Sequence, residues 1–139
     1  ETHALLAEYE SRHAGRFRVL RVEAPFNFSR LVNAAAREAR GEYLLLLNND
    51  TEVLHGDWMA AMEEQAQRRS VGCVGAKLLY PDLTVQHAGV VLGRGFGYAG
   101  HAFARAGGGE PGHDGALQRP GNYSAVTAAC LMVRKAVYE

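Results

Sequence analysis

The chain has 139 residues, 47% of them apolar, and its 15 acidic side chains balance its 15 Lys and Arg side chains. A chain of this length can bury one core of modest size, so we expect one compact unit rather than two domains. The balanced charge argues against nucleic acid or an anionic membrane as a partner, and the longest apolar run, Tyr43–Leu47, is far shorter than the ~20 residues of a membrane-spanning helix, so we do not expect an integral membrane chain.

Helix and strand signals alternate from the start of the chain. Thr2–His13 has the spacing of an amphipathic helix, and Phe17–Val22 alternates in the manner of a half-buried strand. An Ala-rich helix follows, with Ser29 as its predicted cap and Gly41 as its stop. The chain therefore begins with a helix, strand, helix pattern.

The next segments predict the centre of the fold. Tyr43–Leu47 is apolar without alternation, which is typical of a central strand covered on both faces. Asp57 is positioned to cap a third helix, and Val71–Tyr80 predicts another buried strand. This alternation implies right-handed crossovers and a mostly parallel sheet with helices packed on its faces.

The pattern changes after residue 80. Val85–Leu92 and Ala125–Val133 predict two more strands, which we expect to be partly antiparallel. The stretch between them is rich in glycine and has no clear period. We therefore expect a long, mobile loop at about Gly93–Gly121.

Two cysteines indicate the redox setting. Cys73 and Cys130 lie in apolar runs and lack CxxC spacing, so we interpret both as small buried thiols. Thiols of this kind are typical of a reducing compartment. We expect a cytoplasmic protein, with the inner face of the membrane as an alternative location for the full-length protein.

Polar residues follow the Tyr43–Leu47 strand abruptly. Asn48-Asn49-Asp50 and Glu52 come where open α/β sheets bind ligands, beyond the carboxyl end of a strand. If the extended geometry persists, Asn48 and Asp50 lie on one side. Mg²⁺ and Mn²⁺ bind one or two protein carboxylates, water and substrate phosphates, so Asp50 is a candidate metal ligand. The alternative is a polar turn leading to the next helix, since Asn and Asp are common turn residues.

Several sequence blocks stand in the order of a known family. GEYLLLLNNDTEV precedes Asp57-Trp58, and VGAKLLYPDLTVQHAGVVLG, GHAF and SAVTAACLMVRK follow. These blocks cover nearly the whole chain and resemble the inverting glycosyltransferase family two, especially its branch that makes bacterial surface polysaccharide such as O-antigen or rhamnan. The resemblance implies a GT-A fold, which is a Rossmann-like three-layer α/β/α arrangement. It also implies sugar transfer from a nucleotide-diphosphate-sugar donor to a glycan or lipid-linked acceptor.

The resemblance implies a donor side of the site. In the family the strand ends in a DxD-type motif whose last acid binds the metal that bridges the donor phosphates, and Asp50 has that place, with Mg²⁺ or Mn²⁺ as the cofactor. Asn48 stands where the first acid is usual, so its contact is expected to be uncharged, and Asn49 lies between the two. Asn33 corresponds to an asparagine that faces the nucleotide, with Asn27 near the base pocket. An Asn in an Ala-rich helix is also commonly solvent-facing.

The resemblance implies an acceptor side as well. Thr127 and Ala128 belong to a TGAC-like strand that borders the acceptor pocket, and Ala128 replaces the usual glycine, adding a methyl group where the backbone approaches substrate. His87 and His101, from the QHAG and GHAF blocks, are candidates for lining the acceptor side. The alternative is that these histidines are surface or hydrogen-bonded structural groups.

The matching blocks correspond to the central part of the family's catalytic domain, truncated at both ends. We expect its nucleotide-binding half to reach about residue 80 and its acceptor-side part to occupy residues 81–139. The family's first strands are expected before Glu1 and its catalytic base beyond Glu139, so this chain alone is expected to be inactive. Uncovered strand edges predict self-association as a homo-oligomer.

Two other functions compete with sugar transfer. One is a non-catalytic nucleotide-sugar or carbohydrate-binding module. The other is a dinucleotide-binding oxidoreductase, because Gly95–Gly100 spells GxGxxG. That fingerprint must open a helix after the first strand of a βαβ unit, whereas here a glycine run and Pro111 soon follow. We therefore interpret these glycines as loop residues.

Overall fold

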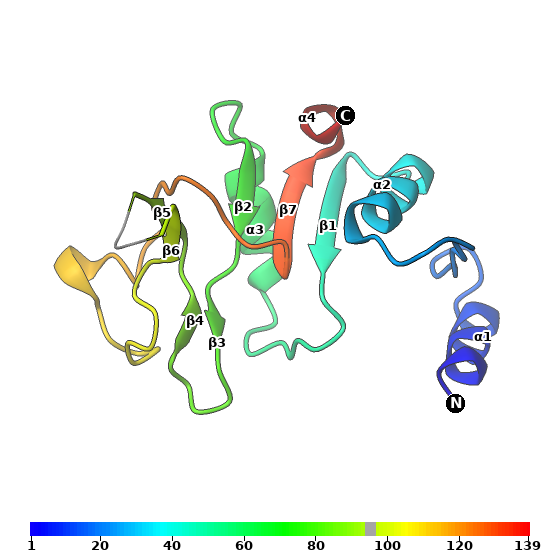
Figure 1. The fold of residues 1–139 in the computed structure, drawn as a ribbon, viewed down its shortest axis with the longest axis horizontal. Coiled ribbons are helices and arrows are strands. Elements are labelled where there is room, and N and C mark those ends of the chain that lie inside the picture. Colours follow the sequence, from blue (N-terminus) through cyan, green and yellow to red (C-terminus); the bar gives the residue numbers. More distant parts are fainter. Residues whose placement is uncertain (94–96) are drawn as a thin grey trace. The chain divides into compact units, whose positions relative to one another are not determined.

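The computed structural model describes residues 1–93 and 97–139, which divide into two compact units, residues 1–39 and residues 40–139 (Figure 1). The expectation of a single unit is therefore wrong. Helix α1 (Thr2–Arg12) contributes no buried residue, and the irregular segment between it and α2 (Phe28–Glu38) is mostly exposed. The first unit consequently buries little apolar surface.

The first unit contains the two predicted helices but not the strand predicted between them. Phe17–Val22 is irregular, because a strand without a neighbouring strand cannot complete its backbone hydrogen bonds. Helix α2 begins at Phe28 because the Asn27 side chain accepts a hydrogen bond from the Arg30 N–H at 2.9 Å. Asn27, and not Ser29, is its N-cap.

The second unit is built on a three-stranded sheet with the order β1-β7-β2 (Figure 1). Strand β7 (Cys130–Arg134) pairs with β1 (Tyr43–Leu47) and with β2 (Cys73–Gly75), and both pairings are antiparallel. A mostly parallel sheet is not confirmed, since every strand pairing in the described part of the chain is antiparallel. β1 and β2 still run in the same direction, but β7 lies between them. β1 was expected to be central and instead lies at one edge of this sheet.

Helix α3 (Trp58–Ala66) covers one face of the sheet and provides its core contact. Two buried residues of this helix meet two of β7: Met62, Ala66, Cys130 and Met132. Alternation along β1 and β7 directs Leu44 and Val133 to the opposite face, where both are also buried. The third layer of the expected α/β/α arrangement is not confirmed. No helix in residues 1–93 and 97–139 is long and apolar enough to cross a membrane.

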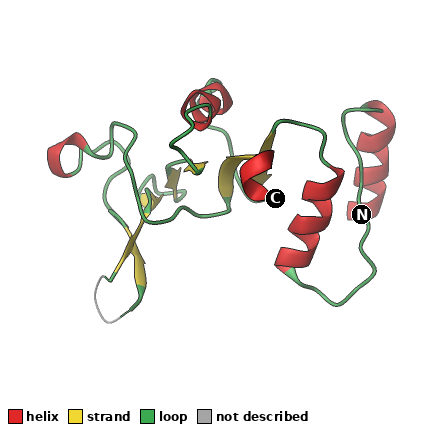
Figure 2. Cartoon of the chain, turned by 90° about the horizontal axis from the view of Figure 1, so that it is seen from above, coloured by secondary structure: helices red, strands yellow, loops and turns green. Residues whose placement is uncertain are grey.

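Two short antiparallel hairpins replace the longer strands predicted after β2. β3 (Leu78–Leu79) pairs with β4 (Val85–His87), and β5 (Val90–Leu92) pairs with β6 (Ala99–His101). Much of this part of the chain is loop, as Figure 2 shows by colour.

The Val85–Leu92 strand is interrupted at Gly89, whose φ of +107° does not belong to a strand. The expected loop Gly93–Gly121 is not uniformly irregular, because it contains β6 and the short 3-10 helix His113–Gly115. The last short element, α4 (Lys135–Tyr138), follows β7 directly.

Both cysteines are free thiols. Cys130 is 3% exposed in the core, as predicted, and burial raises the pKa of its thiol. Cys73 at the start of β2 is exposed, so the expectation that it is buried is wrong.

The Arg134 side chain forms hydrogen bonds at the carboxyl end of α3, and replacing it tests how much these bonds stabilise the fold. Its guanidinium donates to the Ala66 carbonyl and, at 2.9 Å each, to the Arg68 and Val71 carbonyls. We expect Arg134→Ala to destabilise this end of the helix by about 2–3 kcal/mol, because these carbonyls lose a charged donor. Hydrogen exchange of residues 63–75, measured by mass spectrometry on the full-length protein, should accelerate accordingly.

Arg134→Lys is the matched variant for this experiment. Lysine keeps the charge but has no planar fork of donors, so we expect only partial recovery of protection. Equal exchange in wild type and Arg134→Ala would show that these hydrogen bonds contribute nothing to the fold.

Candidate functional site

The polar stretch after β1 is an exposed turn that is anchored at its first residue. The Asn48 N–H donates to the Ala129 carbonyl at 2.9 Å, one residue beyond the β1–β7 pairing. The chain then turns at Asn49 and Asp50, and the Thr51 hydroxyl donates to the Asn48 carbonyl at 3.0 Å. The extended geometry on which the shared side of Asn48 and Asp50 depended does not persist beyond Asn48. The alternative, a polar turn, describes the backbone.

Asp50 presents its carboxylate from this turn, with the Asn48 and Asn49 side chains exposed beside it in the sequence. Among the residues that the structure describes, no group of three His, Cys, Asp or Glu side chains is arranged to hold a metal ion. These residues cannot form a metal coordination shell made of protein ligands alone. They fit Mg²⁺ or Mn²⁺ bound through a single carboxylate, with water and phosphate oxygens completing the shell.

The segment that leads into β7 carries the predicted acceptor residues and lies beside the end of β1. The Ala129 N–H donates to the Thr127 hydroxyl at 3.3 Å, and the Ala129 carbonyl accepts from Asn48. Thr127 and Ala128 are half-buried. The structure therefore brings the predicted acceptor segment into direct contact with the first residue of the predicted donor motif.

Among the predicted acceptor residues, His87 is the buried one. The residue is 1% exposed, and its Nε2 accepts from the Gly89 N–H at 3.2 Å and from the Thr127 N–H at 3.3 Å. Its Nδ1 lies 3.0 Å from Nδ1 of His101, with the two rings edge to face at 5.1 Å. His87 is thus a hydrogen-bonded group inside the fold and does not itself face solvent, whereas His101 is exposed.

These bonds form one continuous chain across the site. It runs from Asn48 through Ala129 and Thr127 to His87 and ends at His101. Four residues that the sequence singled out are therefore joined, although they come from four separate parts of the sequence.

The surroundings of His87 favour its neutral form. Burial lowers the pKa of the ring, and the neighbouring His101 lowers it further. The two backbone N–H groups at Nε2 act in the same direction, because a proton on that nitrogen would face two donors.

The two asparagines predicted near the nucleotide belong to the first unit. Asn27 caps α2 through its side chain, and Asn33 is exposed on that helix. Their role in binding the donor stays a prediction.

The GxGxxG stretch does not have the context of a dinucleotide site. Gly95 and Phe96 lie outside the described residues, while Ala99 and Gly100 belong to strand β6. The end of the stretch is therefore extended rather than the first turn of a helix, which the fingerprint requires.

The family described as Glycosyl transferase family 2 matches residues 1–138. The chain belongs to this family. The predicted resemblance is confirmed, and membership implies the GT-A nucleotide-sugar transferase fold. No solved structure matches the chain.

Two relatives match most or all of this family 2 chain. Uncharacterized protein y4gI of Sinorhizobium fredii is 51% identical over 124 residues, which are 89% of this chain and 14% of that protein. O-antigen biosynthesis protein RfbC of Myxococcus xanthus is 44% identical over 146 residues, which cover 100% of this chain and 11% of that protein. The chain therefore spans only a small part of the length of either relative.

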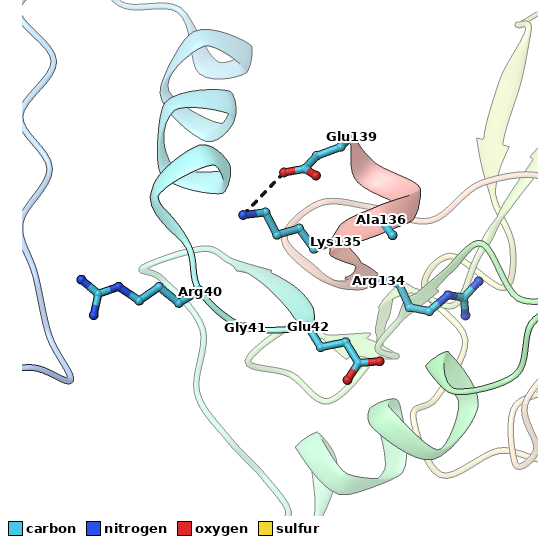
Figure 3. A pocket seen from close by; sticks show the side chains of 7 residues that line it. All are labelled: Arg40, Gly41, Glu42, Arg134, Lys135, Ala136 and Glu139. Atoms are coloured by element: carbon cyan, nitrogen blue, oxygen red, sulfur yellow. Dashed lines mark ion pairs between the residues drawn. The ribbon is translucent and has the colours of Figure 1, made fainter.

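A pocket of about 430 Å³ lies at the other end of β1 and has no part in this family 2 site (Figure 3). Its lining mixes positive and negative side chains around the start of β1 and the end of β7: Arg40, Gly41, Glu42, Arg134, Lys135, Ala136 and Glu139. Lys135 is already paired with Glu139 at 3.5 Å, and Arg134 donates to backbone carbonyls. Tyr43 pairs with Arg134, whereas Leu47 pairs with Cys130, so the pocket and Asp50 lie at opposite ends of the strand pair.

Sequence reasoning missed Gly89, the last residue of QHAG. Its N–H donates to His87, its carbonyl accepts from Ala102 at 2.9 Å, and its φ is +107°. A Cβ at this position would lie 2.2 Å from Cγ of Tyr123. A glycine two residues after the histidine of the QHAG block was the available signal, because glycine is the residue that tolerates this backbone conformation.

Gly89→Ala tests whether this close approach holds the site together. We expect a loss of at least about 2–3 kcal/mol of stability, because both the positive φ and the clash with Tyr123 are unfavourable. The matched control is Gly100→Ala on β6, where a Cβ meets nothing within 4 Å. Thermal unfolding of the full-length variants measures the difference, and equal midpoints for the two would contradict the proposed constraint.

The lowered pKa of His87 predicts a dependence of stability on pH. The folded protein resists protonation of this ring, whereas the unfolded chain takes up a proton near the ordinary pKa of 6.5. The contribution of the neutral His87 ring to the stability of the fold is therefore complete above about pH 6.5, and it falls as the pH drops below that value. We expect the thermal midpoint to decrease between about pH 7.5 and about pH 5.5, and to decrease less in His87→Gln.

His3→Gln is the control for this experiment. His3 is exposed on α1, so its replacement should leave the pH dependence of the wild-type midpoint unchanged. A His87→Gln protein with the full wild-type dependence would show that another group is responsible.

Proposed function

We propose that the full-length protein transfers a sugar, with inversion, from a nucleotide-diphosphate-sugar donor to a glycan or lipid-linked acceptor in the synthesis of an O-antigen-type surface polysaccharide. Membership of glycosyl transferase family 2 supports the transferase class. The likeness to the O-antigen biosynthesis protein RfbC supports the polysaccharide. The predicted location stays the cytoplasm or the inner face of the membrane.

The observation that carries this proposal is the chain of hydrogen bonds from Asn48 to His101. A glycosyl transferase has to hold two substrates so that the acceptor hydroxyl reaches the anomeric carbon of the donor. The hydrogen-bonded link between the Asp50 turn and the segments of Thr127 and His87 would hold the two substrates in such an arrangement. It also supports assigning the nucleotide-binding half to residues up to about 80 and the acceptor side to residues 81–139.

In the proposed reaction an acceptor hydroxyl attacks the anomeric carbon from the side opposite the nucleotide diphosphate. The bond to the leaving phosphate oxygen breaks, and the configuration of that carbon inverts. Mg²⁺ or Mn²⁺, when bound, supplies positive charge that stabilises the departing diphosphate. Asp50 would hold this ion, with Asn48 and Asn49 adding uncharged hydrogen bonds. The base that accepts the hydroxyl proton is expected outside residues 1–139.

Asp50→Asn in the full-length protein tests the metal assignment. We expect kcat/KM for transfer to fall at least about a hundredfold, because the amide keeps the shape of the carboxylate but loses its charge. Release of nucleoside diphosphate, measured over a range of Mn²⁺ concentrations, should show that the remaining activity responds weakly to the ion.

The control for this variant is Glu64→Gln, which makes the same chemical change at an exposed position on α3. It should leave kcat/KM and the response to Mn²⁺ within about threefold of wild type. Wild-type turnover by Asp50→Asn would remove Asp50 from the metal site. Binding of the donor without transfer by the full-length wild type would favour a non-catalytic nucleotide-sugar-binding module.

A further inference from the structure

The partners of His87 determine which of its nitrogens carries the proton. Nε2 faces the N–H groups of Gly89 and Thr127, at 3.2 Å and 3.3 Å. Both groups can only donate, so Nε2 has to present its lone pair. A neutral imidazole then carries its single proton on Nδ1.

The proton on His87 Nδ1 determines the state of His101 in turn. The two Nδ1 atoms are 3.0 Å apart, so one of them donates and the other accepts. Since His87 is the donor, His101 uses the lone pair of its Nδ1 as the acceptor. The proton of a neutral His101 is therefore on Nε2, on a residue that is exposed at the end of β6.

We propose that His87 is a positioning residue that fixes His101 in the Nε2–H form, and that this N–H donates a hydrogen bond to an oxygen of the acceptor saccharide. The ligand class rests on the proposed function, whereas the tautomer rests on these three contacts alone. His87 acts through its neighbour, and only His101 touches the ligand.

The arrangement also excludes a role as general base for His101. Its one lone pair is engaged by His87, and its other nitrogen carries a proton. A proton added to Nδ1 of His101 would face the proton on Nδ1 of His87. His101 therefore binds and orients the acceptor, and the removal of the hydroxyl proton belongs to another group.

The first experiment measures the tautomer without using activity. Diethyl pyrocarbonate acylates a neutral imidazole at a nitrogen with a free lone pair, so the fixed His101 should react slowly in spite of its exposure. The full-length protein is treated with the reagent, and each histidine is followed by peptide mass spectrometry. We expect His101 to react at least about fivefold more slowly than His3 and His55, which are both exposed.

Two substitutions of His87 separate its two hydrogen-bonding roles. His87→Asn keeps an N–H at the position of Nδ1 and should keep His101 slow. His87→Gln keeps an acceptor near the Gly89 and Thr127 N–H groups but loses that donor, so His101 should react as fast as His3. Fast reaction of His101 in the wild type, or equal rates in the two variants, overturns the tautomer assignment.

The second experiment leaves the buried His87 intact and tests the N–H donor. The side-chain amide of Gln reaches the position of Nε2, whereas that of Asn does not. Binding of an O-antigen oligosaccharide to the full-length protein is measured by calorimetry, which needs no turnover. We expect His101→Asn to weaken binding about tenfold and His101→Gln to weaken it no more than about threefold.

The outcomes distinguish this inference from the proposed function. Equal weakening in His101→Asn and His101→Gln, or no weakening in either, overturns the donor role of His101. A wild-type protein that does not bind the oligosaccharide overturns the saccharide assignment, while the reagent experiment still decides the tautomer. Binding as expected without any sugar transfer supports His101 and counts against the transferase.

Discussion

The buried imidazole of His87 is the constraint on which the described site depends. A polar ring that is 1% exposed has to satisfy both nitrogens inside the protein, because a buried polar atom without a partner is costly. His87 does this with the Gly89 N–H, the Thr127 N–H and the ring of His101, which belong to three different segments. Thr127 is 40 residues away in the chain. One side chain therefore sets the spacing between β4, β6 and the approach to β7.

The insertion of β7 between β1 and β2 supplies the second constraint. Because β7 is antiparallel to both neighbours, its amino end, at Cys130, meets the carboxyl end of β1, at Leu47. This puts the Thr127–Ala129 segment beside the polar turn that follows β1, and the bond from Asn48 to Ala129 joins them. A parallel β7 would carry the same segment to the other end of the sheet, away from Asp50. The antiparallel direction of β7 is thus what places the Thr127–Ala129 segment beside the turn at Asp50.

Short sequence patterns predicted the helices and the turn. The predictions that were wrong depend on contacts between residues far apart in the sequence. The α1 and α3 segments were predicted from apolar spacing, and the turn at Asn49 and Asp50 was one of two readings that residue chemistry allowed. The position of β7 was not predictable, because alternation identifies a strand without naming its neighbour. The strand predicted at Phe17–Val22 is absent for the same reason. Its alternating pattern suits a strand, but in the described part of the chain no other strand pairs with it. The burial of His87 also depends on contacts between segments, so its sequence block indicated a site residue but not its internal position.

These bonds also bear on the alanine that replaces a glycine in the acceptor segment. Ala128 lies between Thr127, whose N–H is bonded to His87, and Ala129, whose N–H and carbonyl are bonded to Thr127 and Asn48. Its backbone is therefore held from both sides by residues that do not depend on its own side chain. The methyl group of Ala128 therefore leaves these anchors in place. Under the proposed function, its expected effect is a narrower choice of acceptor rather than a different backbone.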